Sequence, residues 1–237
     1  MPSNIFILTG AGISAESGLG TFRDTKGGGI WAKFDPMKLA TPEAFARDPE
    51  TVLGFYDLRR RDLLNAKPNA AHLALARLEA ALAERGDGLT LVTQNIDDLH
   101  ERAGSHRVIH MHGELLKARC CACEAVRPWL DDLTVAHACS DCGRPGALRP
   151  HVVWFGEMPL ALDLIGRALR KVDLFVAIGT SGAVYPAAGF VAEARAYGLR
   201  TCEINLEAAD NADLFDEQRL GAASETVPAW VEEVLKG

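Results

Sequence analysis

Four cysteines in two Cys-x-x-Cys pairs carry the most specific chemical signal in the sequence. Cys120 and Cys123 form one pair, and Cys139 and Cys142 form the other. This spacing is typical of a zinc ribbon, in which four thiolates hold one Zn²⁺ at tetrahedral geometry and leave no open position for a substrate. The sequence therefore predicts one structural zinc ion bound by these four cysteines.

A glycine-rich turn directly after an apolar run could bind the phosphates of a nucleotide. Residues 5–8 run into Thr9-Gly10-Ala11-Gly12, and the pattern Gly-x-Gly-x-x-Ala ends at Ala15. In a dinucleotide site Gly10 permits the tight turn, Gly12 lets the backbone approach the pyrophosphate, and the small Ala15 lets the following helix pack closely, with its N-terminus directed at the phosphates. The turn alone is equally compatible with a tight strand-to-helix connection.

A histidine lies where a short predicted strand meets the cysteine-containing segment. His112 follows the strand at residues 108–109 and directly precedes that segment. A histidine at such a junction can serve as a general base. By itself it could equally be a hydrogen-bonded polar group near the core. We predict this structural role for the neighbouring His110.

The elements that must position these residues alternate between strand and helix. Besides the first strand, residues 89–93, 173–178 and 201–205 are continuous apolar runs, which is typical of buried parallel strands. Residues 69–85 show the clearest helical pattern, with a cap at Asn69 and a stop at Gly86. We therefore predict an α/β fold with a doubly wound, Rossmann-like parallel sheet.

Each predicted strand ends in a polar cluster. These clusters begin at Thr9, Thr93, Gly179 and Asn205. Ligands of open α/β sheets bind outside the carboxyl ends of the strands, so four such clusters describe one crevice. The clusters therefore favour a nucleotide site over a simple turn.

Two stretches interrupt the alternation and are predicted to build a smaller lobe. Residues 31–65 carry helical patterns at 42–47 and 51–64, and residues 114–148 carry the cysteines. We expect one catalytic domain over residues 1–237, whose larger Rossmann-like lobe comprises residues 1–30, 66–113 and 149–237.

Composition and charge argue against several classes of protein. The chain has 25 basic and 32 acidic side chains and a net charge of −7, which disfavours binding to nucleic acid or to an anionic membrane. No apolar run approaches the ~20 residues of a membrane span, so we expect a cytoplasmic protein. In that compartment the paired cysteines favour a metal over disulfides. Cys121 could compete with Cys120 for the metal, Cys202 is expected in the core, and no oligomeric state is specified.

The order of these motifs resembles that of the sirtuin family, from about residue 5 to the C-terminus. The resemblance rests on residues 10–18, 21–24, 93–97, 112–114, 179–181 and 205–207 and on both cysteine pairs. It implies an NAD-dependent protein lysine deacylase that consumes NAD as a co-substrate. In the family the acyl-lysine oxygen attacks the nicotinamide ribose, nicotinamide leaves, and the acyl group ends on 2′-O-acyl-ADP-ribose. The partners implied are acylated lysine side chains of proteins.

The resemblance also implies roles for individual residues. His112 matches the catalytic base that deprotonates the ribose hydroxyls, and Asn95 and Asp97 match residues around the nicotinamide and its ribose. The implied NAD-binding set is Gly10, Ala11, Gly12, Ser14, Ala15, Glu16, Thr21, Phe22, Arg23, Gln94, Asn95, Ile96, Asp97, Gly179, Thr180, Ser181, Asn205, Leu206 and Glu207. One departure is Leu19-Gly20, where many relatives carry Ile-Arg.

A second motif bears on the acyl group. Tyr56 and Arg59 are three residues apart in a predicted helix and share a face. Tyr-x-x-Arg resembles the subclass that removes succinyl, malonyl or glutaryl groups, and Ala40 matches the small residue that leaves room for them. A guanidinium is a natural partner for a carboxylate. An ordinary solvated arginine is the alternative, because Arg60 and Arg61 follow. We expect acetyl-lysine to be processed as well.

The segment after residue 152 resembles the one with which the family pairs the substrate backbone by strand addition. Its members are Val153, Trp154, Phe155, Gly156 and Glu157. A buried edge strand is a compatible alternative.

Four other functions remain open at this point. A sirtuin could act mainly as a deacetylase or as a protein ADP-ribosyltransferase. A classical NAD oxidoreductase would account for the glycine-rich turn, and a zinc-ribbon interaction module would account for the cysteines but would leave His112 without a role.

Overall fold

The computed structural model describes residues 2–20 and 38–236. Its centre is a six-stranded sheet in the order β3-β2-β1-β7-β8-β9, with every neighbouring pair parallel. The strands are β1 (Asn4–Thr9), β2 (Gly88–Thr93), β3 (Val108–His110), β7 (Leu174–Ile178), β8 (Arg200–Asn205) and β9 (Glu217–Leu220). All four long strands expected from the sequence are therefore confirmed.

The strand order identifies where a ligand of this sheet belongs. β1 pairs with β2 on one side and with β7 on the other, so the chain winds outward in both directions from β1. This is the Rossmann order 3-2-1-4-5-6, in which the order of connection reverses between the first and fourth strands. The crevice predicted at the carboxyl ends of the strands therefore lies beyond Thr9 and Ile178.

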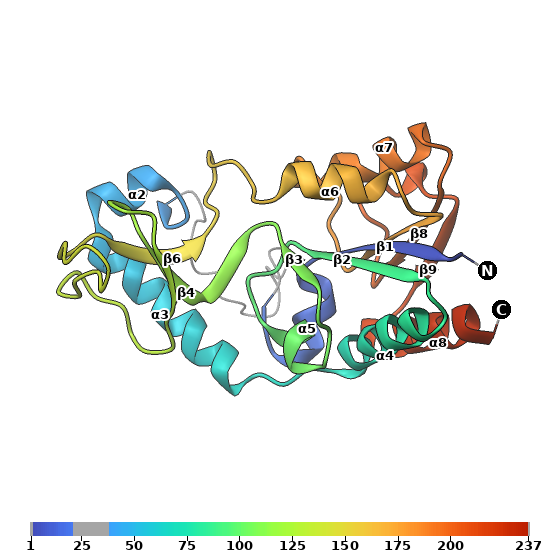
Figure 1. Cartoon of the computed structure of the whole chain (residues 1–237), viewed down its shortest axis with the longest axis horizontal. Helices are drawn as coiled ribbons and strands as arrows, with labels where there is room; N and C mark the ends of the chain where they lie inside the picture. Colours follow the sequence, from blue (N-terminus) through green and yellow to red (C-terminus); the bar gives the residue numbers. More distant parts are fainter. Residues whose placement is uncertain (1, 21–37, 237) are drawn as a thin grey trace.

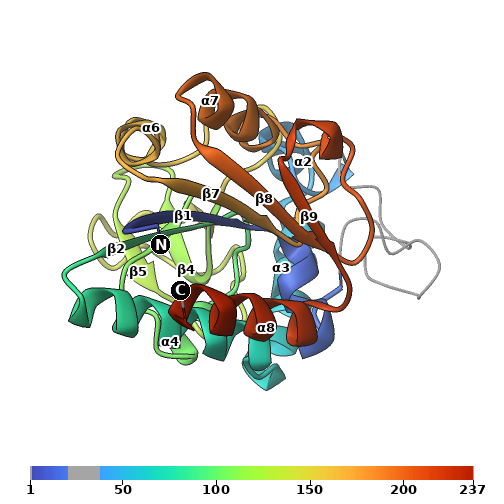
Figure 2. The same cartoon turned by 90° about the vertical axis from the view of Figure 1, so that its right-hand side faces the viewer.

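Helices cover both faces of the sheet (Figure 2). One face carries α4 (Ala70–Glu84) and α8 (Ala223–Lys236), and the other carries α6 (Leu162–Leu169) and α7 (Phe190–Ala196). The stripe of Leu75, Leu78 and Leu82 on α4 is fully buried, as its spacing predicts. The Asn69 side chain accepts a hydrogen bond from the backbone N–H of Ala71, so the predicted helix cap is confirmed.

A second, smaller sheet lies at the other end of the molecule from the two termini (Figure 1). It is antiparallel, in the order β5-β4-β6, and consists of β4 (Gly113–Cys120), β5 (Val126–Pro128) and β6 (Leu148–Val152). The predicted helices are also present beside it as α2 (Pro42–Arg47) and α3 (Pro49–Asn65). The remaining elements are the short helices α5 (Leu99–Arg102), η3 (Ala187–Gly189) and η4 (Ala212–Leu214).

The structure corrects one local expectation. The helix after the first glycine turn is the 3₁₀ helix η1 (Ala11–Ser17). Ala15 on it is exposed, so the prediction that Ala15 packs closely against the strand is wrong. Of the helices in the described residues, none combines the length and the apolar character needed to cross a membrane.

Candidate active site

The turns after β1 and β7 are in direct contact. The backbone N–H of Gly10 donates to the carbonyl of Ile178, and that of Gly12 donates to Gly179, both at 2.9 Å. A Cβ on Gly12 would lie 2.7 Å from the Gly179 Cα, which is closer than real side chains allow. Gly10 has an ordinary extended φ of −126°. The close approach of the two turns therefore requires glycine at both positions. The backbone N–H of Gly12 already has a hydrogen-bond partner within the protein.

Ser14 is the centre of a buried polar network beside this turn. Its hydroxyl donates to Asp97 Oδ2 at 3.0 Å and accepts from Asn95 Nδ2 at 3.1 Å. Asn95 Nδ2 also lies 3.2 Å from the carbonyl of Gly10. His72 Nε2 approaches the hydroxyl at 3.4 Å, and His72 Nδ1 accepts from the Asn69 backbone. Three residues predicted for the nucleotide site are thus brought together.

The surroundings of Asp97 shift the pKa of its carboxyl group. The residue is 7% exposed, and burial raises the pKa of its carboxyl group. Hydrogen bonds from the Leu99 amide and from Ser14 act in the opposite direction. Asp97 is therefore a fixed hydrogen-bonding group at the wall of the crevice.

His112 lies in the turn between β3 and β4, and its ring contacts the loop after β2. Its Nδ1 lies 3.0 Å from the backbone carbonyl of Gln94. A carbonyl only accepts, so the proton of the neutral imidazole is on Nδ1 and the lone pair is on Nε2. Burial lowers the pKa of His112, only partly offset by the Gln94 contact. At neutral pH the ring is therefore an unprotonated base with a fixed orientation.

The ends of β7 and β8 supply the other half of the crevice. Asn205 Nδ2 donates to the carbonyl of Thr180 at 2.7 Å, and the Ser181 carbonyl accepts from the Asp210 backbone. Leu206 and Glu207 are exposed. Glu16 accepts hydrogen bonds from the backbone N–H and the hydroxyl of Ser224, at the beginning of α8. A structural role for Glu16 is therefore present whether or not it contacts a nucleotide.

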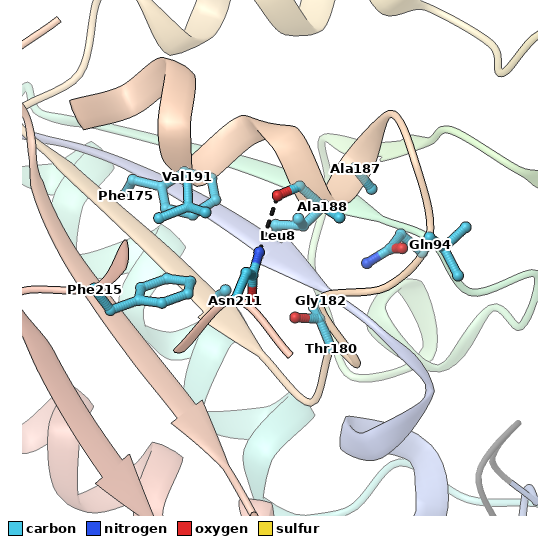
Figure 3. Close-up of a pocket in the computed structure, with 12 residues that line it drawn as sticks. Leu8, Gln94, Phe175, Thr180, Gly182, Ala187, Ala188, Val191, Asn211 and Phe215 are labelled. Carbon is cyan, nitrogen blue, oxygen red and sulfur yellow. Dashed lines mark hydrogen bonds between the residues drawn. The ribbon is translucent and has the colours of Figure 1, made fainter. Parts of the chain in front are cut away.

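A small cavity lies below these turns, between the sheet and η3 (Figure 3). Its volume of about 10 Å³ holds about one water molecule. Gln94 lines it from one side and Asn211 from the other, where Asn211 Nδ2 donates to the Ala188 carbonyl. The cavity is too small for a nucleotide.

The residues predicted for the acyl pocket also converge. Tyr56 is 1% exposed on α3, and its hydroxyl accepts a hydrogen bond from the Trp154 indole at 2.8 Å. Ala40 belongs to the same apolar cluster, and its carbonyl accepts from the Phe155 amide. Arg59 is half-buried. Burial lowers the pKa of its guanidinium, and the charges of Tyr56 and Asp97 offset this only in part. The Arg59 guanidinium lies over the Phe55 ring, with its Cζ 5.8 Å from the ring centroid.

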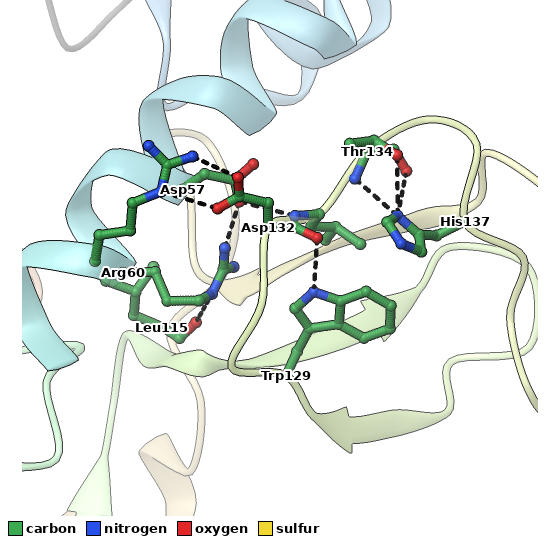
Figure 4. Close-up of polar contacts among 9 residues, drawn as sticks. Asp57, Arg60, Leu115, Trp129, Asp132, Thr134 and His137 are labelled. Atoms are coloured by element: carbon green, nitrogen blue, oxygen red, sulfur yellow. Dashed lines mark hydrogen bonds and ion pairs between the residues drawn. The ribbon is translucent and has the colours of Figure 1, made fainter.

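A neighbouring face of α3 is fixed by a different pair (Figure 4). Arg60 is 1% exposed and forms an ion pair with Asp57 one turn earlier, and its Nε donates to the Leu115 carbonyl. Asp57 also accepts from the backbone N–H of Leu133. Arg61, in contrast, is an exposed partner of Asp132. The three consecutive arginines thus have three different environments.

The predicted substrate-binding segment lies outside the strands, because β6 ends at Val152. Within the segment, the amide of Val153 donates to the His112 carbonyl and that of Phe155 to Ala40, both at 2.9 Å. Glu157 turns inward, where it accepts from the Trp154 amide and from Arg149. The backbone here therefore connects the histidine segment to the predicted acyl pocket.

The four paired cysteines meet in one cluster. Their sulfurs lie within 4.8 Å of one another, with 3.7 Å from Cys120 to Cys142 and from Cys123 to Cys139. Tetrahedral Zn²⁺ with Zn–S bonds of ~2.3 Å requires sulfurs ~3.8 Å apart, whereas a disulfide needs ~2.0 Å. The donor set therefore fits one zinc ion. Cys121 is not part of the cluster.

Comparison with known proteins decides the family. A model of the Sir2 family matches residues 10–186. The chain belongs to the Sir2 family. An NAD-dependent protein deacylase of Caulobacter vibrioides is 62% identical over 231 residues, 98% of this chain and 96% of that protein. An NAD-dependent protein deacylase of Leishmania major is 56% identical over 235 residues, with the same two coverages. The structure of a Sir2 homologue in complex with NAD is similar with a TM-score of 0.88 at 40% identity, covering 99% of this chain and 90% of that one.

Some of the Sir2 motifs cannot be placed. Thr21, Phe22 and Arg23, together with the glycines at 27–29, lie outside the described residues. Cys202, by contrast, is 2% exposed inside β8, as expected for a core residue.

Three residues of this Sir2 chain with positioning roles were missed in the sequence. His72 supports Ser14, Arg149 supports Trp154, and Glu203 accepts from the backbone of Ala209 at 2.8 Å in the turn after β8. The signal for Glu203 was its charge within an apolar strand, and that for His72 was its place three residues after a helix cap. Arg149 gave no comparable signal.

Proposed function

We propose that this NAD-dependent protein deacylase of the Sir2 family removes succinyl and malonyl groups from protein lysines, and acetyl groups less efficiently. The products would be free lysine, nicotinamide and 2′-O-acyl-ADP-ribose. The proposal rests on Tyr56 and Arg59, one turn apart on α3, and on the packing of the buried Tyr56 in the same apolar cluster as Ala40. Both side chains offer hydrogen-bond donors to the end of an acyl chain.

The chemistry of this pair favours an acyl group that ends in a carboxylate. A guanidinium binds a carboxylate through two parallel hydrogen bonds and stays charged in proteins. Burial raises the pKa of Tyr56, so its hydroxyl remains protonated and able to donate. A neutral acetyl group has no carboxylate for the Arg59 guanidinium to bind, so this site favours it less.

His112 is proposed as the general base. Its unprotonated Nε2 would take the proton of a ribose hydroxyl, so that the hydroxyl attacks the acyl carbon. The Gln94 carbonyl keeps the ring in the tautomer that this step requires. The NAD substrate would lie along the crevice, with its nicotinamide end near Asn95 and Asp97 and its adenosine end near Ser181 and Asn205.

The four cysteines are proposed to hold zinc for structure alone. Four thiolates complete the coordination, so no position is left for a reacting group. We also propose the division into a larger Rossmann-like lobe and a smaller lobe that contains α3 and the cysteine cluster.

Substitution of Arg59 tests the acyl preference. Arg59→Met should lower kcat/KM on succinyl and malonyl peptides about 10²-fold, because two charge-assisted hydrogen bonds are lost, and acetyl peptide much less. Arg61→Met, on the exposed side of the same helix, is the matched control and should leave the ratios unchanged. An equal loss on all three peptides would overturn the acyl assignment.

A further inference from the structure

We propose that Trp154 is a positioning residue that directs the hydroxyl proton of Tyr56 toward the acyl group. The role of Trp154 would be to make the end of the acyl pocket a site of donors only. This inference rests on the proposed function, because it concerns how the same pocket selects its substrate.

The hydrogen bond between the two residues has a defined direction. Trp154 Nε1 lies 2.8 Å from the Tyr56 oxygen. The indole N–H only donates, so the tyrosine oxygen is the acceptor. Both residues are almost completely buried, at 1% exposed for Tyr56 and 2% for Trp154. The Tyr56 proton therefore points away from Trp154 and is available to an acceptor in the proposed pocket.

The indole is held in place independently of Tyr56. The Arg149 guanidinium stacks on the Trp154 ring, with its Cζ 3.2 Å from the ring centroid. Arg149 in turn donates to both carboxylate oxygens of Glu157 and to the Val152 carbonyl. Glu157 also accepts from the Trp154 backbone amide at 2.8 Å. This arrangement fixes where the indole N–H points before any substrate binds.

Arg59, a second hydrogen-bond donor, adds to the preference for an acyl group that ends in acceptors. Arg59 approaches from the next turn of α3 and contains donors only. An acyl chain that ends in oxygen acceptors can pair with both residues. A chain that ends in a methyl or an ammonium group offers the Tyr56 hydroxyl no acceptor, which costs binding free energy. Trp154 thus contributes to selectivity without a direct contact to the acyl carboxylate.

A double-mutant cycle separates this role from simple packing. Trp154→Phe removes the N–H but keeps an aromatic ring, and Tyr56→Phe removes the hydroxyl. We expect Trp154→Phe to lower the succinyl-to-acetyl ratio of kcat/KM about fivefold, the equivalent of one neutral hydrogen bond. In the Tyr56→Phe background the same substitution should leave that ratio unchanged, because the hydroxyl that it directs is gone.

Each outcome has a definite meaning. A wild-type enzyme without preference for succinyl-lysine would overturn the proposed function and with it the premise of this inference. A wild-type preference that Trp154→Phe leaves intact, or lowers equally in both backgrounds, would overturn the role of Trp154 alone. If Trp154→Phe does not fold, benzothienylalanine at position 154 serves instead, since it keeps the bicyclic shape and lacks only the N–H. The indole N–H proton resonance of Trp154 should also move upfield in Tyr56→Phe, and an unmoved resonance would contradict the hydrogen bond.

Discussion

The six-stranded sheet and the cysteine-containing sheet hold their side chains by different means. The large sheet has an apolar core on each face, built around Phe6 and Phe175 on one side and around Leu75 and Leu78 on the other. The small sheet packs against α3 through two apolar clusters, one with Leu53, Leu133 and two of the cysteines and one with Leu115 and Val152. Asp57 and Arg60 of α3 add polar contacts, to the Leu133 amide and the Leu115 carbonyl.

This difference separates proposed catalysis and nucleotide binding from proposed acyl selection. The proposed base and the residues proposed to face the nucleotide lie at the edge of a sheet whose packing needs no ligand. The proposed acyl-selecting pair is on a helix that also contacts the cysteine region, where Asp57 accepts from the Leu133 amide and pairs with Arg60. We therefore expect damage to the cysteine region to change substrate selection while the large sheet stays folded.

Metal removal should have the largest effect and should be confined to one region. Structural zinc binding contributes on the order of 10 kcal/mol to the folding of small zinc modules. After chelation, amide hydrogen exchange should become fast in β4, β5 and β6 and stay slow in β1 and β7. Unchanged exchange in the small sheet, with metal loss verified by elemental analysis, would contradict the structural zinc site.

Substitution of the base should affect the rate and not the fold. His112→Asn keeps a donor for the Gln94 carbonyl but removes the basic nitrogen, so formation of acyl-ADP-ribose should slow by about 10²- to 10⁴-fold. Circular dichroism should show the same melting transition as the wild type. A variant within tenfold of the wild-type rate would exclude His112 as the base.

The same residue predicts the pH dependence. The base must be unprotonated, and burial lowers the pKa of His112 below its ordinary value of 6.5. The acid limb of kcat/KM should therefore lie below pH 6.5, with activity lost as the pH falls through the lowered pKa. An acid limb above pH 6.5 would argue against this assignment.

Removing the buried ion pair between Asp57 and Arg60 on α3 should have an intermediate effect on stability. Asp57→Ala leaves the buried Arg60 without its charge partner and should lower the free energy of unfolding by about 3 kcal/mol. Asp132→Ala removes the partner of the exposed Arg61 and should change stability little. Similar melting temperatures of the two variants in parallel denaturation experiments would show that the buried pair has no special role.

The contact between the glycine turns should give the smallest of these effects. Gly12→Ala places a Cβ against Gly179 and should destabilise the protein by about 1–3 kcal/mol while weakening NAD binding. Gly54→Ala, on the exposed side of α3 with no atom within 4 Å of the added Cβ, should be neutral or stabilising. Equal NAD affinity of Gly12→Ala and wild type, measured by calorimetry, would separate this turn from the nucleotide site.

Much of the fold could be predicted because periodicity reports which residues face a core. The continuous apolar runs predicted β1, β2, β7 and β8, and the leucine stripe predicted α4. The cysteine spacing gave the cluster, because two short loops can bring four sulfurs together in only a few ways.

The tertiary partners could not be predicted in the same way. Arg59, Arg60 and Arg61 are equivalent by residue type, and only the elements packed around α3 make one half-buried, one buried and one exposed. The close packing expected for Ala15 failed because the turn continues as a 3₁₀ helix. The support of Trp154 by Arg149 joins side chains whose spacing suggests no interaction.

Product analysis by mass spectrometry tests the central claim most directly. The protein is incubated with NAD and an equimolar mixture of acetyl, succinyl and malonyl peptides of one sequence. We predict that the succinyl and malonyl peptides lose their acyl groups first, with one nicotinamide and one 2′-O-acyl-ADP-ribose formed for each. Earlier consumption of the acetyl peptide, a peptide that gains the mass of ADP-ribose, or reduction of NAD would contradict the account.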